Sequence, residues 1–208
     1  MHVYFIRHGE SEANIRMIRQ GPDEPLSSLG ILQAKALAER VASIPAEVIF
    51  SSHYRRARET AEYIQDALGK SATPTPLFSE FKQPSELVGL PIHGEESERA
   101  KELKHIHEHQ PEWHLSDEEN FYDAKTRTLE ALQFLEELPF AHMIVVTHSH
   151  LMLYIAAAIL LPDTISPAAQ REFMGSMTIA NTGISECEFL GKEKGWRLIS
   201  WNDNAHLI

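Results

Sequence analysis

The stretch HVYFIRHGES, residues 2–11, decides the fold class of this chain. Residues 2–7 are mostly β-branched, aromatic or aliphatic, and the run stops at Gly9, which predicts a short buried strand. Residues 47–51 (EVIFS) and 143–147 (MIVVT) have the same character and the same abrupt polar end. Continuous apolar strands are typical of a sheet that is covered on both faces. The three runs therefore predict a buried central sheet.

Helical periodicity occupies the chain between and around these strands. Apolar residues recur every three or four positions in three stretches: 29–44, 54–68 and 128–138. Ser27 or Ser28 is available as the N-cap of the first stretch, and Gly69 is a stop signal after the second. Strands that alternate with helices predict an α/β fold, a three-layer sandwich with a largely parallel central sheet and helices on both faces.

The C-terminal part follows a different pattern. Residues 183–190 alternate apolar and polar side chains, residues 191–195 begin and end with glycine, and a strand-like sequence resumes over 196–201. Two alternating segments joined by a glycine-containing turn predict a β-hairpin, which we place at the edge of the sheet.

The composition is that of one globular domain: 208 residues, 43% hydrophobic and 24% charged. We predict a single domain over 1–208, in which the polar segment 81–121, rich in His and Glu, is an inserted lid. Thirty Asp and Glu against 19 Lys and Arg give a net charge of −11. A field of that sign repels polyanions, so nucleic acid is excluded as a general partner.

The number of cysteines and the length of the apolar runs exclude further classes of protein. Cys187 is the only cysteine, which excludes an internal disulfide and any multi-cysteine zinc or iron–sulfur site. The apolar run over 151–161 is too short to cross a bilayer, and no cationic segment precedes an apolar run at the start. We expect a cytoplasmic protein with no membrane partner.

Polar side chains follow each of the three predicted strands where the strand ends. Arg7 and His8 end the first, Arg56 comes shortly after the second, and His148 follows the third. Ligands of open parallel sheets bind at the carboxyl ends of the strands, so these groups are expected to share one rim. Such a rim suits a small, dense anion such as phosphate. Taken singly, each of these side chains has a simpler explanation than anion binding. Arg56 could form an ion pair with Glu59, and His148 could be a buried, hydrogen-bonded residue.

The ordered motifs resemble the histidine phosphatase superfamily, which includes the cofactor-dependent phosphoglycerate mutases. RHGES with Asn14, over 7–14, is similar to the family signature, and the likeness extends through QG (20–21) and PLS (25–27). SSHYRRARETA (51–61) is similar to the second arginine motif, and VVTH (145–148) to the second histidine motif. Together the motifs cover most of the chain.

The resemblance implies roles for these residues. His8 would attack phosphorus and form a phosphohistidine, while Arg7, Arg56 and His148 hold the phosphoryl oxygens. Further phosphate-binding positions that it implies are Asn14, Gln20, Gly21 and Ser149. No metal and no cofactor is expected, because the arginines supply the positive charge. The implied reaction is hydrolysis of a phosphomonoester, and the implied partner is a small phosphorylated metabolite.

The family also places a carboxylic acid after the second arginine motif, where it protonates the leaving oxygen. Glu80, in LFSEF (77–81), matches that position best, and Glu86 is the alternative. We expect an incoming phosphate dianion to raise the pKa of this acid.

Two departures from the family pattern are visible. Ser149 and His150 follow His148 where many members carry Gly, and KQPS (82–85) replaces the usual glycine-containing stretch after the acid. The first departure alters the turn beside the phosphate, and the second indicates an unusual substrate wall.

The alternating His105, His107 and His109 lie in a charged segment, where a solvated helix face is favoured over a zinc site. Two alternatives to a phosphatase stay open. One is an isomerase of the phosphoglycerate mutase type, although such mutases carry a longer insertion after the acid. The other is a phospholigand-binding module without catalysis. The sequence leaves the oligomeric state open.

Overall fold

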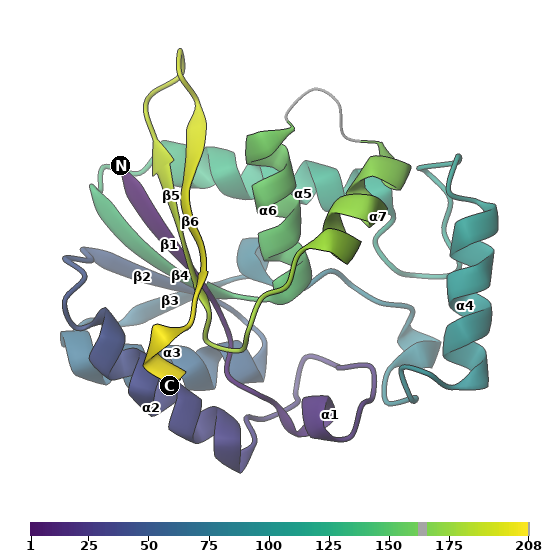
Figure 1. Cartoon of the computed structure of the whole chain (residues 1–208), viewed down its shortest axis with the longest axis horizontal. Helices are drawn as coiled ribbons and strands as arrows, with labels where there is room; N and C mark the ends of the chain where they lie inside the picture. Colours follow the sequence, from purple (N-terminus) through teal and green to yellow (C-terminus); the bar gives the residue numbers. More distant parts are fainter. Residues whose placement is uncertain (162–165, 208) are drawn as a thin grey trace.

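The computed structural model describes residues 1–161 and 166–207. Six strands form one sheet in the order β3-β2-β4-β1-β5-β6 (Figure 1). Their bounds are β1 His2–Arg7, β2 Val48–Ser52, β3 Ala72–Thr75, β4 His142–Thr147, β5 Ile184–Phe189 and β6 Trp196–Asp203. The first four strands are parallel, and β5 runs antiparallel to both β1 and β6. The predicted largely parallel sheet with a C-terminal edge hairpin is confirmed.

Seven α-helices and three short 3-10 helices surround this sheet in the part of the chain that the structure describes. The α-helices are α1 Glu12–Ile15, α2 Ser28–Val41, α3 Arg55–Leu68, α4 Glu95–Ile106, α5 Phe121–Glu136, α6 Ser149–Leu160 and α7 Pro167–Ser176. The 3-10 helices are η1 Pro76–Phe78, η2 Ser85–Leu87 and η3 Ala205–Leu207. Among the described residues, no helix is long and apolar enough to cross a membrane.

The two faces of the sheet are both buried, which explains the continuous apolar strands. In β4, Met143 and Val145 face a core formed with α5 and α6, whereas Ile144 and Val146 face a second core formed with α2 and α3. Successive side chains of a strand point to opposite faces, so a strand between two helix layers needs apolar residues at every position. The result is the three-layer arrangement seen in Figure 1.

Local signals at the helix ends agree with the structure. The side chain of Ser27 accepts a hydrogen bond from the Gly30 amide at 2.9 Å, so Ser27, and not Ser28, caps α2. Gly69 ends α3 in the left-handed conformation, with φ of 62°. Helix α5 begins earlier than its predicted stripe, because Asn120 and Asp123 form a capping box ahead of it.

The segment 81–121 leaves the sheet and carries η2 and α4, which stands to one side of the molecule (Figure 1). Arg19 ties it to the body of the protein, since its Nε donates to Ser97 Oγ and its Nη1 to Gln83 Oε1, both at 2.9 Å. His105 lies in the last turn of α4 and His107 is its C-cap. Within residues 1–161 and 166–207, no group of three or more His, Cys, Asp or Glu side chains is arranged to hold a metal ion.

Candidate active site

Parallel pairing of β1 and β4 sets the position of the two strand-end histidines. Arg7 and Thr147 are direct partners in the register, and the His8 amide donates to the Thr147 carbonyl at 3.0 Å. The residue after each strand, His8 and His148, therefore emerges at the same edge. Their ring centroids lie 5.0 Å apart, and both side chains are buried. The predicted convergence of strand ends is present in the geometry.

Arg56 lies in the first turn of α3 and joins the two imidazoles. It is 2% exposed, and its Nε donates to His8 Nε2 while its Nη2 lies beside His148 Nδ1, each at 3.1 Å. Its Nη1 donates to the Gly21 carbonyl at 2.8 Å. Burial lowers the pKa of Arg56 to about 10, so it stays a cation at neutral pH. The surface ion pair with Glu59 is made by Arg55 instead, at 2.7 Å.

His8 is held as a neutral imidazole with a defined tautomer. Its Nδ1 lies 2.6 Å from the Gly9 carbonyl oxygen, which requires Nδ1 to carry the proton and leaves the lone pair on Nε2. Burial and the charges of Arg56 and Arg7 hold the pKa of His8 well below its usual value. In this structure that lone pair accepts the hydrogen bond from Arg56 Nε, and a neutral imidazole in this tautomer is the form that can attack phosphorus.

Arg7 and His148 complete this edge of the sheet. Arg7 Nη1 donates to the Ile179 carbonyl, but its buried Nε has no acceptor within the described chain. Because an unpaired buried N–H is costly, this atom is a place where an external oxygen would be favoured. His148 Nε2 lies 2.8 Å from Ser52 Oγ. Burial, Arg56 and His8 lower the pKa of His148, so it too is neutral.

Glu80 is the carboxylate that the fold brings to this edge, beside the start of α6. It is 9% exposed and accepts hydrogen bonds from the amides of His150, Leu151 and Phe81 at 3.1, 3.2 and 3.1 Å. Burial alone would raise its pKa, but the charge of His150 and these hydrogen bonds lower it to about 2. Glu86, the alternative, is exposed and accepts from Ser116 Oγ at 2.9 Å.

The remaining predicted phosphate-binding positions divide into two groups. Gly21 contacts Arg56 through its carbonyl, and Ser149 is the first residue of α6, directly after His148. Asn14 and Gln20 instead meet at Ser11, whose amide donates to Asn14 Oδ1 and whose hydroxyl donates to Gln20 Oε1, both at 3.0 Å. Their oxygens therefore shape the loop around α1 in this structure.

Several supporting contacts had no signal in the sequence. Thr60 Oγ1 accepts from the Gly9 amide and Asn181 Nδ2 donates to the His8 carbonyl, both at 3.0 Å, so two distant segments hold the loop that carries His8. His150 belongs to the polar run after the third predicted strand and departs from the family pattern, but no role is predicted for it. Its Nδ1 lies 3.3 Å from Glu80 Oε2.

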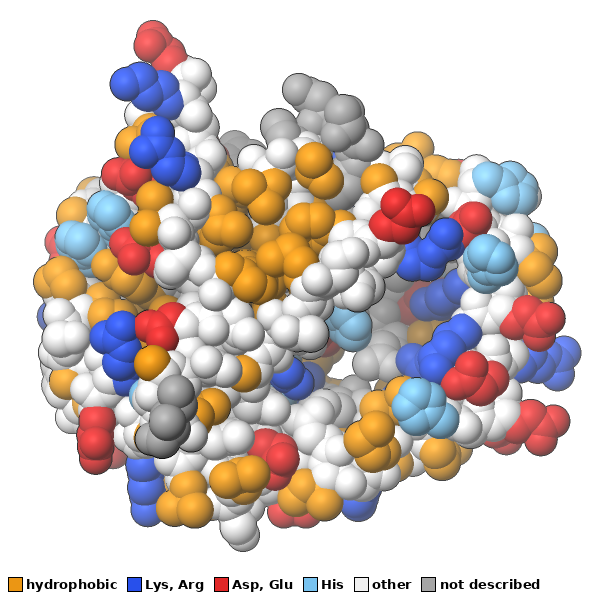
Figure 2. All heavy atoms as spheres, viewed as in Figure 1, with side chains coloured by type: hydrophobic (Ala, Val, Ile, Leu, Met, Phe, Trp, Pro, Cys, Tyr) orange, Lys and Arg blue, Asp and Glu red, His pale blue; other side chains and the backbone are white. Residues whose placement is uncertain are grey.

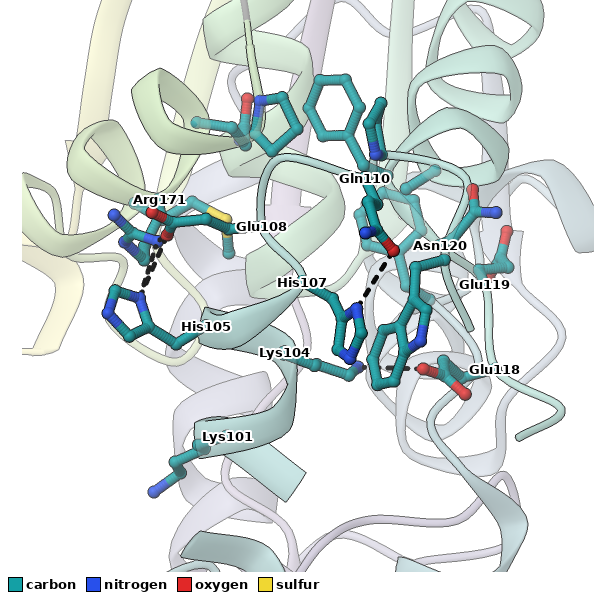
Figure 3. Close-up of a pocket in the computed structure, with 18 of the residues that line it drawn as sticks. Lys101, Lys104, His105, His107, Glu108, Gln110, Glu118, Glu119, Asn120 and Arg171 are labelled. Atoms are coloured by element: carbon teal, nitrogen blue, oxygen red, sulfur yellow. Dashed lines mark hydrogen bonds and ion pairs between the residues drawn. The ribbon is translucent and has the colours of Figure 1, made fainter. Parts of the chain in front are cut away.

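A cavity of about 550 Å³ lies between the segment 81–121, α6 and α7 (Figure 3), where the surface is hollowed in the space-filling view (Figure 2). Its aromatic wall consists of Phe81, Trp113, Phe121 and Tyr154. The rings of Phe81 and Tyr154 are 4.6 Å apart, and those of Phe121 and Tyr154 are 6.4 Å apart. Phe81 directly follows Glu80, and Tyr154 lies one helical turn after His150, but Arg7, His8, Arg56, Glu80 and His148 do not line the cavity.

Ion pairs also line this cavity. Lys104 Nζ lies 3.5 Å from Glu118 Oε1, and Arg171 pairs with Glu108 (Figure 3). His107 stacks on Trp113, with ring centroids 4.4 Å apart. Gln170 also lines the cavity, and its buried Nε2 and Oε1 have no partner among the described residues. The cavity therefore offers a ligand an aromatic wall together with one unpaired amide.

Several solved structures have the same fold as this chain. A putative α-ribazole-5'-P phosphatase from Escherichia coli is 20% identical, with a TM-score of 0.82 over 98% of this chain and 97% of that one. A mutant phosphoserine phosphatase from Entamoeba histolytica in complex with phosphoserine is 22% identical, with a TM-score of 0.79 over 100% and 99%. A mycobacterial glucosyl-3-phosphoglycerate phosphatase in complex with VO3 is 23% identical, with a TM-score of 0.77 over 97% and 98%.

Sequence comparison adds a relative and a family. A protein of Yersinia pestis (strain Pestoides F) called probable phosphoglycerate mutase GpmB is 28% identical over 210 residues, which is 100% of this chain and 95% of the relative. The family model of the histidine phosphatase superfamily (branch 1) matches residues 3–204. Because that match spans nearly the whole chain, the protein belongs to the histidine phosphatase superfamily.

Proposed function

We propose that the protein hydrolyses a small phosphomonoester through a phosphohistidine on His8, without a metal ion. The observation that carries this proposal is the arrangement around His8: a neutral imidazole whose Nε2 lies 3.1 Å from the Nε of a buried Arg56, beside His148. The unpaired Nε of Arg7 adds a donor for a phosphoryl oxygen. An oxyanion held there would lie next to the nucleophile.

In the first half-reaction, His8 Nε2 forms a bond to phosphorus as the bond to the leaving oxygen breaks. Arg7, Arg56 and His148 stabilise the phosphoryl oxygens as their charge redistributes, which is most of what this transfer needs from a protein. Glu80 serves as the general acid for the leaving oxygen. Water then attacks the phosphohistidine, its proton goes to Glu80, and inorganic phosphate leaves.

We infer the substrate class from the aromatic cavity, which is joined to the candidate site through Phe81, the residue after Glu80. The leaving group departs on the side of the acid, and the aromatic wall there favours a leaving group with an apolar or aromatic portion over a fully hydroxylated one. The segment 81–121 acts as a lid in this proposal, because it supplies Phe81, Trp113 and Phe121 to that wall. A cytoplasmic location stays a prediction from the sequence.

A phosphoglycerate mutase-type isomerase is the second candidate, and the name of the Yersinia relative favours it. The two functions differ in the fate of the phosphoryl group, which a mutase returns to the substrate skeleton and a phosphatase gives to water. Conversion of 3-phosphoglycerate to 2-phosphoglycerate without release of inorganic phosphate would decide for the isomerase.

The test is a panel of phosphomonoesters assayed with purified wild type, His8→Ala and His2→Gln, each with and without EDTA. His2 lies at the opposite end of β1 and pairs with Glu186 at 2.8 Å, so its variant is a control for loss of a histidine elsewhere. We expect turnover by wild type and His2→Gln that resists EDTA, and loss of about a thousandfold or more in His8→Ala. Equal activity of wild type and His8→Ala would overturn the proposal, and loss with EDTA would overturn its metal-free mechanism.

A further inference from the structure

We propose that His150 is the proton reservoir of the reaction, so that the leaving oxygen receives its proton from a Glu80–His150 pair and not from an isolated carboxylic acid. This inference rests on the proposed function and deepens it. His150 acts through Glu80, which makes it a positioning residue for the acid.

The geometry of the pair is well defined. His150 Nδ1 lies 3.3 Å from Glu80 Oε2, and the His150 amide donates to the same oxygen at 3.1 Å. The Leu151 amide fixes the other oxygen at 3.2 Å. Glu80 is thus held against the first turn of α6, where the helix dipole also favours a carboxylate over a carboxylic acid.

In this environment Glu80 lacks, at neutral pH, the proton that a general acid must donate. A carboxyl group with a pKa of about 2 is ionised at pH 7 and has no proton to donate. His150 has the opposite tendency: partial desolvation where its ring meets Glu80 would lower its pKa, but the charge and hydrogen bond of Glu80 raise it above the ordinary value. Of the two partners, the imidazole is therefore the one that holds the proton before the substrate binds.

Other charged and titratable groups face the pair and limit this effect. Arg7 on β1 and Arg19 in the loop after α1 oppose protonation of His150. Arg56 and Tyr54 on the α3 side, and Tyr154 on α6, interact with Glu80. An incoming phosphate dianion offsets the arginine field and raises the proton affinity of both groups. Transfer of the proton from His150 to Glu80 requires the larger rise at Glu80, the group that faces the leaving oxygen in this proposal.

The proton balance then closes over one turnover. His150 Nδ1 gives its proton to Glu80 Oε2, and Glu80 passes it to the leaving oxygen as the P–O bond breaks and the bond to His8 Nε2 forms. The leaving alcohol departs, and His150 is neutral. In the second half-reaction, water supplies hydroxide to phosphorus, and its other proton returns through Glu80 to His150. The His150 side chain is 53% exposed, so solvent can also reload it.

Two measurements on the full-length protein test the proposal. The first is an NMR titration of the His150 ring in wild type and in Glu80→Gln: we expect a raised pKa in wild type that falls in the variant. The second is the pH profile of kcat for an alkyl and an aryl phosphate in wild type, His150→Gln and the control His2→Gln, which removes another His–Glu pair far from the site.

In wild type, kcat for the alkyl phosphate should fall as pH rises through the His150 pKa, because the pair then loses its proton. His150→Gln should lower that kcat by about tenfold to a hundredfold at pH 7 and move the fall to lower pH, while the aryl phosphate changes by less than about twofold. Equal loss on both esters, or no loss, would overturn the proposal and leave the proposed function standing. Lack of turnover by wild type on any ester would overturn both.

Discussion

At the scale of single residues, Arg56 is the buried cation around which the candidate site is arranged. A buried guanidinium is costly unless its N–H groups are hydrogen-bonded, and here all three nitrogens have a partner within 3.1 Å. These partners, the rings of His8 and His148 and the Gly21 carbonyl, are neutral. The positive charge therefore remains available to an incoming anion, which is the condition that transfer of a phosphoryl group requires.

The choice between Glu80 and Glu86 as the acid is testable with matched variants. Glu80→Gln keeps the shape of the side chain but removes the proton donor, so kcat for alkyl phosphates should fall by about a hundredfold or more. Aryl phosphates, whose leaving groups need less help, should lose less than about tenfold. Glu86→Gln is the control, since Glu86 is exposed and contacts Ser116. If the substrate selectivity appears in Glu86→Gln and not in Glu80→Gln, the assignment of the acid is wrong.

At the scale of elements, α2 packs so closely against the loop after β1 that two glycines are required. A Cβ on Gly9 would lie 2.7 Å from the Gly30 carbonyl oxygen, and a Cβ on Gly30 would overlap the backbone of Glu10. This contact fixes the loop that carries His8, because Gly9 and Glu10 follow it directly. Helix packing thereby positions the nucleophile.

Gly30→Ala should consequently affect stability and activity together. We expect a loss of about 2–3 kcal/mol in the free energy of unfolding and a fall in kcat, because the backbone after His8 must shift. Urea unfolding and steady-state kinetics measure the two effects. Gly175→Ala in α7 is the control: nothing lies within 4 Å of its added Cβ, so stability should stay equal or rise by up to about 1 kcal/mol. Unchanged kcat in Gly30→Ala would contradict this account of the loop.

The elements that sequence reasoning found and those it missed differ in a physical way. Helices α2 and α3 each have one polar side, so their periodicity is visible. Helix α6 is buried over 151–153 and 155–157, and a helix that is apolar all round gives no amphipathic stripe. Strand β3 has four residues with Pro74 among them, and only its pairing with β2 makes it a strand. Propensity does not report such pairing.

The candidate site likewise contains residues that the sequence predicted and contacts that it could not predict. Arg7, His8, Arg56 and His148 follow strands, and strand order alone brings strand ends together. The contact of Glu80 with His150 joins residues 70 positions apart. It depends on where the loop after η1 meets the first turn of α6, a helix that the sequence did not predict. The lowered pKa of Glu80 follows from this contact and could not be predicted without it.

At the scale of the whole molecule, the protein combines a net charge of −11 with a cationic site and an aromatic cavity. The overall charge repels a phosphate dianion at long range, so local contacts must provide the affinity. Figure 2 shows acidic and basic side chains intermixed beside α4, next to the hollow. We infer that apolar contact in the cavity supplies part of the substrate binding that electrostatics does not.

A substitution in the cavity wall tests that inference. Trp113→Ala should raise KM for a naphthyl phosphate by about tenfold, because burial of apolar area contributes roughly 25 cal/mol per Å². KM for glycerol phosphate should change by less than about twofold. Tyr122→Ala is the control, since Tyr122 is an exposed aromatic residue of α5 outside the cavity lining. An equal change in KM for both esters would show that the cavity does not select the leaving group.

The most direct test of the central claim is to trap the phosphorylated enzyme. Wild-type protein is mixed briefly with a radiolabelled phosphomonoester, denatured, and the labelled peptide is mapped. We predict one label on the peptide that contains His8, labile in acid and stable in base as a phosphoramidate is, and no label in His8→Ala. Label that resists acid, or that persists in His8→Ala, would contradict the account.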